Sequence, residues 1–346
     1  MKYHFSHRNA VDADFVVNVD WLALNCYRTS DDFEPSVFTI RDKSGGNKYF
    51  ADSCSVYLND ECFARLCYNS RSSIIDIRIV QVRIENAFLY NERIVDLLQM
   101  FFADMRLKFH NISRLDVAGD FQRLIDYEEP RRLIEELTAG VVVTNNRSKF
   151  FVGGTCDKAI EYEYLKIGSR TSAACAYMYN KTKEMEEGKT KGYIIDTWKG
   201  AGFDLSRDVW RIEVSITDSQ YTLRHDDEIV FSMSEIWQLF DKDILPLLYS
   251  VLVRKHFTFK RVCRLANKSR WPDVNLLVGS VVKCVRVYKE YANSLNGWQR
   301  LLRGRISKMI ATHDYDDEKL GDALRAIEFD LSMRMVKNRA ALSDAI

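Results

Sequence analysis

Residues 15–27 of the 346-residue chain read FVVNVDWLALNCY, a run whose valine, leucine and aromatic content is typical of a buried β-strand. Turn-forming Asp, Gly, Asn and Ser lead from it to further β-rich runs, which read SVFTIRD (36–42), SCSVYL (53–58), CFARLCY (62–68) and IIDIRIVQVRIENAFLY (74–90). Runs that follow each other this closely are typical of hairpins or a meander. We therefore expect the fold to begin with an antiparallel sheet.

Two later stretches carry apolar residues at the spacing of a helix. The first covers residues 92–109 with Asn91 as a candidate cap, and the second covers residues 128–140 with Pro130 near its start and Gly140 as its stop. Strand-like runs follow them, at residues 111–123, 162–168, 174–180 and 209–217. From residue 233 onward the pattern is helical.

The predicted fold class is α+β. Strands, a helix and a strand are followed by a second set of strands, so we expect an antiparallel-sheet body built of two similar halves over residues 1–225. An all-helical C-terminal domain with a basic face is expected over residues 226–346. The chain is 47% hydrophobic and 29% charged, which is ordinary for a globular protein with a sizeable core.

Several classes of protein do not match this composition. The chain has no apolar stretch of about 18 residues, and its first 15 residues lack the apolar segment of a signal peptide. We therefore expect no membrane partner and a cytoplasmic location. The eight cysteines are scattered without a CxxC pair, which indicates reduced thiols and not a zinc site or a disulfide framework.

Positive charge is concentrated near the C-terminal end. Residues 251–310 contain fourteen Lys and Arg against two acidic residues, in a chain whose total net charge is only +1. Such asymmetry indicates a segment that binds a polyanion such as DNA, although a basic helical face that neutralises the acidic remainder would give the same count. The candidate DNA-binding residues are Arg254, Lys255, Lys260, Arg261, Arg264, Lys268 and Arg270.

Acidic residues stand at unusual places in three of the strand-like runs. Alternation puts Asp116 and Asp120 on one face of their strand, and it puts Glu213 beside Arg211 on the polar face of another. Asp20 interrupts the apolar run VNVDWLAL. Three carboxylates are compatible with a site for Mg²⁺ or Mn²⁺, because hard cations prefer oxygen ligands. Hydrogen-bonded structural acids or a solvated face are the alternative interpretation.

Two tyrosines in the run AYMYNK alternate onto the same face of a short strand. These are Tyr177 and Tyr179, and Lys181 follows them. A phenol can attack a phosphodiester when it is deprotonated or when a metal activates the phosphate. Lys181 and Arg211 would then stabilise charge on the phosphorus in the transition state. Ordinary strand aromatics would give the same pattern.

Five motifs in this order resemble the rolling-circle replication initiation factors of the Rep-trans type, a family of plasmid initiators and related relaxases of conjugative elements. The motifs are VDWLAL (19–24), VQVRIENAFLY (80–90), ISRLDVAGDF (112–121), GSRTSAACAYMYNKTKE (168–184) and WRIEV (210–214), and the resemblance covers residues 14–217. The segment AACAYMYNK matches the family pattern for the nucleophile only loosely.

The resemblance implies an activity and a set of roles. Such proteins nick one strand of double-stranded origin DNA, often at an extruded hairpin, by metal-assisted transesterification. The tyrosine becomes joined to the 5′ phosphate, and a free 3′ hydroxyl is left for replication or transfer. Carried over by motif, Asp20, Asp116 and Glu213 would hold Mg²⁺ or Mn²⁺. Tyr179 would be the nucleophile, with Tyr177 as its rival.

Two other classes of protein remain as alternatives. A non-catalytic DNA-binding regulator could retain the same fold, and in it the acids and tyrosines would not converge. A tyrosine recombinase or topoisomerase would need its tyrosine on a helix among Arg, His and Lys residues, which the strand-like run AYMYNK does not provide. The expected helical region could also serve for homodimerisation or for binding a host helicase.

Overall fold

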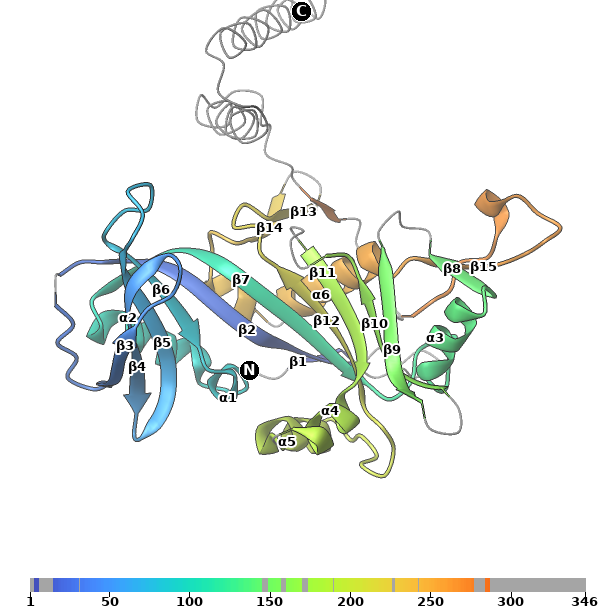
Figure 1. The fold of residues 1–346 in the computed structure, drawn as a ribbon, viewed down its shortest axis with the longest axis horizontal. Coiled ribbons are helices and arrows are strands. Elements are labelled where there is room, and N and C mark those ends of the chain that lie inside the picture. The colour runs from blue at the N-terminus through green and yellow to red at the C-terminus, as the bar shows by residue number, and fades with distance from the viewer. Residues whose placement is uncertain are drawn as a thin grey trace, which may run out of the picture. The chain divides into compact units, whose positions relative to one another are not determined.

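The computed structural model describes residues 3–5, 15–30, 32–144, 149–156, 160–169, 174–188, 190–225, 228–241, 243–276 and 284–286. The chain divides into two compact units, Met1–Tyr288 and Lys289–Ile346. The second unit lies outside the described residues. The elements described below all belong to the first unit (Figure 1).

One large sheet forms most of the first unit, and every strand pair in it is antiparallel. Its strand order is β3-β4-β5-β6-β2-β7-β12-β11-β10-β9, and β1 also pairs with β2. The strands are β1 (Tyr3–Phe5), β2 (Phe15–Arg28), β3 (Thr39–Gly45), β4 (Phe50–Leu58), β5 (Glu61–Ser70), β6 (Ile79–Ile84), β7 (Leu107–Phe121), β9 (Phe150–Cys156), β10 (Ile160–Ile167), β11 (Ala174–Asn180) and β12 (Trp210–Ile216).

Two smaller sheets and several helices complete the described part. One sheet has the order β14-β13-β16, from β13 (Thr222–His225), β14 (Glu228–Ser232) and β16 (Cys284–Arg286), and the other pairs β8 (Val142–Thr144) with β15 (Phe259–Arg261). The α-helices are α1 (Asn86–Leu89), α2 (Ile94–Asp104), α3 (Arg131–Thr138), α4 (Lys181–Glu187), α5 (Gly192–Gly200) and α6 (Ile244–His256). Short 3₁₀ turns lie at Trp237–Phe240 and Lys268–Arg270.

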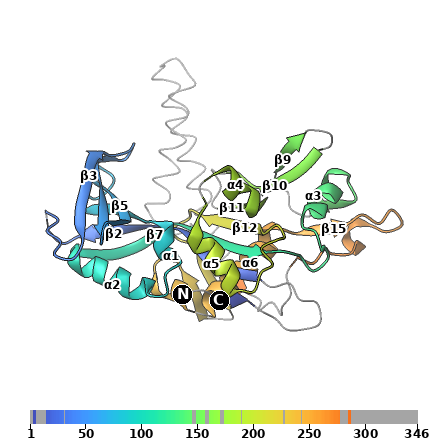
Figure 2. The ribbon, with the colours of Figure 1, turned by 90° about the horizontal axis from the view of Figure 1, so that it is seen from below.

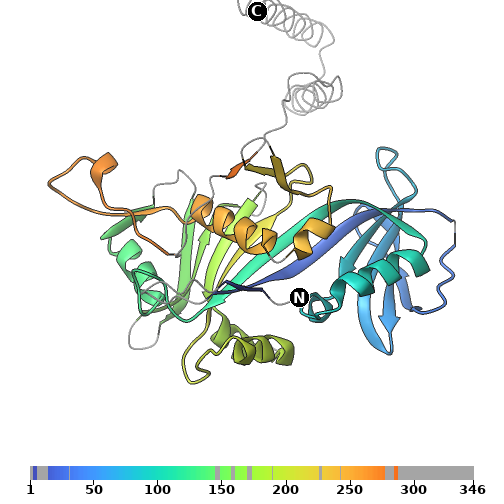
Figure 3. The same ribbon diagram turned by 180° about the vertical axis from the view of Figure 1, so that it is seen from behind.

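Helices α2 and α6 lie on the same side of the large sheet (Figures 2 and 3). This side carries the apolar residues of the central strands, and Val117, Val214 and Ile216 are fully buried there. Helix α6 contacts β2, β7, β11 and β12, which places the main core between this helix and the middle of the sheet. The opposite side of these four strands is therefore left to carry the polar residues.

The predicted α+β class and antiparallel sheet are confirmed, and the strands β2 to β7 and β10 to β12 overlap the runs quoted from the sequence. Helices α2 and α3 lie within the two stretches with helical spacing. Asn91 is not the cap residue of α2, which is Arg93, but its side-chain oxygen accepts the backbone N–H of Arg93 at 2.8 Å. No long apolar helix able to cross a membrane occurs among the described residues.

The structure differs from the sequence analysis in four places. Residues 86–89, expected to continue a strand, form the short helix α1. Residues 107–109, expected to end a helix, begin the strand β7. Helices α4 and α5 lie between the strand-like runs 174–180 and 209–217, where no helix was predicted. Residues 228–232, 259–261 and 284–286, expected to be helical, are strands, and the first and last of them pair with β13 while the second pairs with β8. Residues 277–283 and those from 287 onward lie outside the described residues.

Close packing of α6 on the sheet generates a first prediction. Gly119 lies under Tyr249 of α6, and a Cβ atom at this position would overlap the tyrosine ring. We expect Gly119→Ala to lower the free energy of unfolding by about 1–3 kcal/mol, the usual cost of overpacking a core. Urea unfolding monitored by circular dichroism measures it.

The matched control is Gly200→Ala at the end of α5, where a Cβ would meet no atom within 4 Å. Alanine favours helix over glycine, so this change should leave the stability equal or slightly higher. Equal stability of the two variants would contradict the close approach of Tyr249 to the sheet.

Candidate active site

Four neighbouring strands place polar side chains in three rows across one face of the sheet. In an antiparallel pair, residues directly opposite each other point to the same side, so the register defines the rows. From β11 through β12 and β7 to β2, the rows are Cys175–Ser215–Asp116–Trp21, then Tyr177–Glu213–Ala118–Asn18, and then Tyr179–Arg211–Asp120–Val16. The face predicted from alternation in each strand is thus one shared surface.

Arg211 is the centre of the third row, and its side chain has no exposed surface. Its Nε and Nη2 atoms donate to the two oxygens of Asp120 at 2.6 and 2.8 Å, and its Nη1 donates to Asp20 at 2.6 Å. Nη2 also donates to the Tyr90 hydroxyl at 3.1 Å. The Trp198 indole N–H from α5 donates to Asp120 at 2.8 Å. The guanidinium therefore fixes two carboxylates and is not directed at a substrate.

Asp20 reaches this cluster because of an irregularity in β2. The register between β2 and β7 shifts between Val19 and Trp21, which leaves Asp20 without an opposite residue on β7. Such bulges redirect side chains and are common beside active sites. Burial by itself would raise the pKa of Asp20, but Arg211 foremost, with the lysines nearby, outweighs it and keeps that pKa below its ordinary value.

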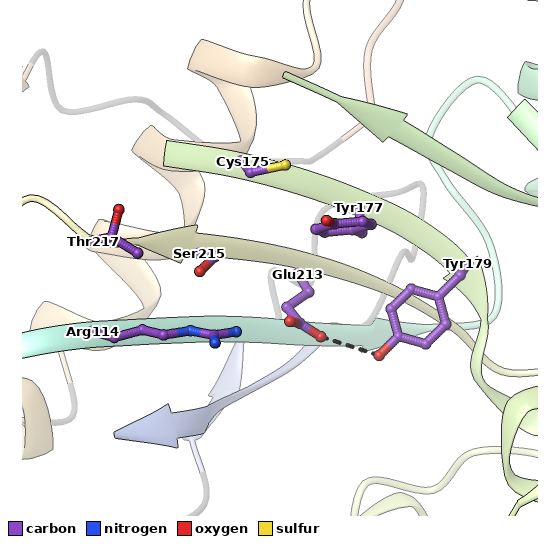
Figure 4. Close-up of a pocket in the computed structure, with 7 residues that line it drawn as sticks. All are labelled: Arg114, Cys175, Tyr177, Tyr179, Glu213, Ser215 and Thr217. Carbon is purple, nitrogen blue, oxygen red and sulfur yellow. Dashed lines mark hydrogen bonds between the residues drawn. The ribbon is translucent and has the colours of Figure 1, made fainter. Parts of the chain in front are cut away.

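Tyr179 and Glu213 form the contact with the clearest chemical meaning. The Tyr179 hydroxyl donates a hydrogen bond to Glu213 Oε2 at 3.1 Å (Figure 4). Burial raises the pKa of Glu213 to about 7, and the carboxylates of Asp20 and Asp116 add to this rise. Burial also holds the pKa of Tyr179 well above its ordinary value. The phenol is therefore protonated at neutral pH, next to a carboxyl group that can exchange a proton there.

Lys181 lies close to the same tyrosine. It is the first residue of α4, directly after the cap residue Asn180, whose side-chain oxygen accepts the backbone N–H of Lys183 at 3.1 Å. The Lys181 ammonium lies 5.5 Å from the centroid of the Tyr179 ring and pairs with Glu184 at 2.7 Å. Burial and the nearby guanidinium lower the pKa of this lysine. The strand-to-helix junction at residue 180 thus positions a cation beside the phenol.

A cavity of about 450 Å³ opens over these rows. Figure 4 shows Tyr177, Tyr179 and Glu213 side by side along it, with Arg114 on the far strand. Among the described residues, its lining is Arg114, Cys175, Tyr177, Tyr179, Glu213, Ser215 and Thr217. Both candidate tyrosines therefore face the same space, and Arg114 contributes a positive charge to it.

Asp116 is held by two residues of the cavity lining. Arg114 pairs with it through two hydrogen bonds of 3.0 and 2.6 Å, and the Ser215 hydroxyl donates to it at 2.5 Å. The Arg114 guanidinium also lies 4.5 Å from the centroid of the Trp21 ring. Of the two arginines on this face, Arg211 is fully buried and Arg114 lies beside the cavity.

The predicted metal ligands Asp20, Asp116 and Glu213 share one face but are not gathered into a binding group. Within the part of the chain that the structure describes, no three His, Cys, Asp or Glu residues are arranged to hold a metal ion. Each acid has its own partner: Arg211, Arg114 and Tyr179, respectively. The donor chemistry still fits a divalent cation, because all three side chains are carboxylates, whose oxygens such ions prefer.

A second feature of the same face is compatible with a further polar ligand. Asn18 is 2% exposed, and neither its Oδ1 nor its Nδ2 has a hydrogen-bond partner among the described residues. It lies in the row of Glu213, separated from it by the small side chain of Ala118. Buried amides normally have partners, so Asn18 marks a place where a ligand or water would be favourable.

The predicted DNA-binding residues occupy a helix, a strand, a 3₁₀ turn and the turn between the last two. Arg254 and Lys255 are in the last turn of α6, Lys260 and Arg261 are in β15, Arg264 is in the following turn, and Lys268 and Arg270 are in a 3₁₀ turn. Lys260 pairs with Asp273 at 3.2 Å, and Arg261 pairs with Glu136 at 3.0 Å. They do not form one helical face, because the chain turns from α6 into a strand.

Sequence reasoning gave no role to three residues that hold the charge cluster together. Asp120 was placed on the correct face, but its pairing with Arg211 was not predicted. Tyr90, at the end of the run VQVRIENAFLY, donates to Asp20 at 3.0 Å. Trp198 comes from a helix that the sequence analysis missed. The sequence contained one indication of this cluster: Asp120 lies on the same face of the strand as Asp116, because the two are an even number of residues apart.

The chain is similar to known proteins in its structure but not in its sequence. No family model matches the chain, and no curated protein matches it. Among solved structures, the chain is similar to "Structure of Rolling Circle Replication Initiator Protein from Geobacillus stearothermophilus", with a TM-score of 0.44 and 15% sequence identity. The alignment covers 75% of this chain and 93% of that chain.

The buried charge cluster generates a second prediction. Replacing Asp120 by alanine leaves the Arg211 guanidinium buried with one of its two carboxylates removed. We expect Asp120→Ala to lower the free energy of unfolding by about 3–5 kcal/mol, the usual effect of breaking a buried ion pair from one side. Urea denaturation followed by tryptophan fluorescence measures the change.

Asp196→Ala is the control, because Asp196 pairs with Lys199 at 3.6 Å on the exposed side of α5. Exposed pairs contribute little, so its unfolding curve should overlay that of the unchanged protein. If Asp120→Ala were as mild as Asp196→Ala, the cluster around Arg211 would not be the structural centre of the site.

Proposed function

We propose that the protein is a replication initiator or relaxase that nicks one strand of origin DNA with Tyr179 as its nucleophile. The observation that carries this proposal is the hydrogen bond from the Tyr179 hydroxyl to Glu213, in a cavity that is also lined by Arg114. A tyrosine that donates to a buried carboxylate beside cations has the arrangement that nucleophilic attack on a phosphodiester needs. The motif order described above supports the same activity.

The proposed reaction is a transesterification. The Tyr179 oxygen attacks the phosphorus, a bond forms between them, and the bond from the phosphorus to the 3′ oxygen breaks. Glu213 is placed to receive the phenol proton, and a proton is returned to the departing 3′ oxygen. The products are a 5′-phosphotyrosine link and a free 3′ hydroxyl, which can prime rolling-circle synthesis or start strand transfer.

The residues around the cavity take different parts in this proposal. Arg114 faces the cavity and would stabilise negative charge on the phosphate, as would Lys181 beside the tyrosine ring. Arg211 is a positioning residue, because its donors are used by Asp20, Asp120 and Tyr90. This assignment replaces the expectation that Arg211 itself stabilises the phosphorus.

A divalent cation, Mg²⁺ or Mn²⁺, belongs to the proposal as well. Asp20, Asp116 and Glu213 would hold it, since carboxylate oxygens are the ligands that these ions prefer. When bound, the ion would supply positive charge at the scissile phosphate. All three acids lie on the same polar face of the sheet, which supports this part of the proposal.

The proposed partner is double-stranded origin DNA, which an extruded hairpin would present partly unpaired. Arg254, Lys255, Lys268 and the other basic residues between positions 254 and 270 would bind its phosphates. A host helicase and a second copy of the chain are further partners in this proposal. Binding that depends on phosphate contacts should weaken steeply as the salt concentration rises.

The test is a nicking assay on a supercoiled plasmid that carries the origin of the protein's own replicon, with Mg²⁺ or Mn²⁺ present. We expect relaxed product and a covalent protein–DNA adduct that survives denaturing electrophoresis. Tyr179→Phe should abolish both, because the attacking oxygen is gone. Peptide mapping of the adduct by mass spectrometry identifies the modified residue.

Tyr177→Phe is the matched control, since Tyr177 lines the same cavity and lies two residues away on β11. It should retain the adduct. An adduct that persists in Tyr179→Phe and disappears in Tyr177→Phe would assign the nucleophile to Tyr177. No nicking of the cognate origin by the unchanged protein, with metal present, would exclude the enzymatic proposal.

One observation favours a second candidate, a DNA-binding regulator that retains the fold without catalysis. Each of the three acids already has a partner within the protein, as purely structural acids would. This candidate predicts specific binding of origin DNA without an adduct. The mapping experiment distinguishes the two, because a regulator gives no phosphotyrosine at either position.

A further inference from the structure

The polar face continues beyond the cavity onto β10 and β9. The row of Tyr177 extends through Lys166 on β10 to Phe151 on β9, because these residues are opposite each other in the register. The row of Tyr179 extends through Tyr164 on β10 to Gly153 on β9. We call Phe151, Tyr164 and Lys166 the aromatic strip. It is continuous with the two tyrosines of the cavity.

The strip exposes its rings to solvent. Phe151 is 51% exposed and Tyr164 is 42% exposed, whereas the opposite side of β10 is closed by the fully buried Leu165. The Tyr164 ring lies over Gly153, where any Cβ atom would overlap it. The glycine thus lets the ring lie against the backbone of β9.

A cation lies between the rings. The Lys166 ammonium is 5.7 Å from the centroid of the Phe151 ring and 5.6 Å from that of Tyr177. Adjacent strands are about 4.8 Å apart, so the two rings are separated by about 10 Å across the sheet, with the lysine between them. Alternating rings and positive charge along an open sheet is the combination that binds single-stranded nucleic acid.

We propose that the aromatic strip binds the single-stranded DNA next to the scissile phosphate, with bases stacked on Phe151 and Tyr164 and a backbone phosphate at Lys166. The inference rests on the function proposed above and adds the path of the strand to it. Bases within a duplex are already stacked and cannot offer their faces to the rings, so the strip selects unpaired DNA. The strip thereby explains why a nicking site would use extruded, unpaired origin DNA.

A second copy of the chain is the other candidate for binding to the aromatic strip. Strand β9 is at the end of the sheet, so a second copy of the chain could also cover its exposed rings. Two observations favour DNA: the strip shares its face with the tyrosine cavity, and its central side chain is positively charged. A contact between two copies of the chain would require neither the nearby tyrosine cavity nor the positive charge of Lys166.

The experiment measures affinity for a fluorescent oligothymidylate of about 15 nucleotides by anisotropy, using the full chain in EDTA so that no cleavage occurs. We expect Phe151→Ala and Tyr164→Ala each to weaken binding by about ten-fold, within the range found for loss of one stacked base. Lys166→Ala should weaken binding and lower the slope of log affinity against log salt by about 0.7, the value for one phosphate on a single strand. Affinity for a duplex of the same length should not change in Phe151→Ala.

Phe150→Ala is the matched control, because Phe150 is the neighbouring residue on β9, is 39% exposed and points to the opposite face. It should bind the oligonucleotide like the unchanged protein. Equal affinities of Phe151→Ala and Phe150→Ala for the oligonucleotide would contradict the proposal that the aromatic strip binds single-stranded DNA. A change of oligomeric state in light scattering, without a change in oligonucleotide affinity, would also overturn it and assign the surface to contacts between copies.

The binding test of the aromatic strip can fail or succeed independently of the nicking test of the proposed function. Weaker binding in Phe151→Ala supports the strip whether or not the unchanged protein nicks DNA, since the measurement involves no chemistry. Nicking that depends on Tyr179, together with unaltered binding in all three strip variants, would keep the nickase and reject the strip.

Discussion

The buried guanidinium of Arg211 is the interaction on which the rest of the site depends. It connects Asp120 on β7, Asp20 on β2 and Tyr90 after α1, so one side chain joins segments that are far apart in the sequence. Removing charges from water is costly, and such clusters rarely add net stability over an apolar core. Their effect here is geometrical, because each carboxylate that Arg211 fixes also faces the cavity side of the sheet.

The acids of the site have different partners, and these partners determine the pKa of each carboxyl group. Burial acts to raise the pKa of both acids, but the guanidinium beside Asp20 outweighs it there, whereas Glu213 has a phenol as its partner and its pKa stays raised. Two carboxylates with separated pKa values, one ionised and one able to exchange a proton near neutrality, are typical of acid–base chemistry.

The sequence was sufficient to predict the faces of single strands but not their neighbours. Alternation placed Asp116, Asp120 and Glu213 on polar faces, and the structure agrees. It could not show that β12 lies beside β7, because residues about 90 positions apart meet there through hydrogen bonds that leave no local pattern. Helices α4 and α5 were missed because they are short, and their positions depend on the cap at Asn180 and on contacts such as Trp198 with Asp120. Which of Arg114 and Arg211 is buried likewise depends on side chains from other elements.

Strand β7 is the one strand that pairs with both β2 and β12. The register of β7 with its two neighbours therefore fixes how far Asp20 on β2 lies from Glu213 on β12 and from Tyr179 on the next strand. A slip of one residue would turn Leu115 and Val117 toward the cavity and bury the aspartates among apolar side chains. A slip of two would keep the polar face but bring Asp120 opposite a different partner. Insertions in this protein can accumulate where loops leave the sheet, while the length of β7 between Leu115 and Phe121 must stay constant.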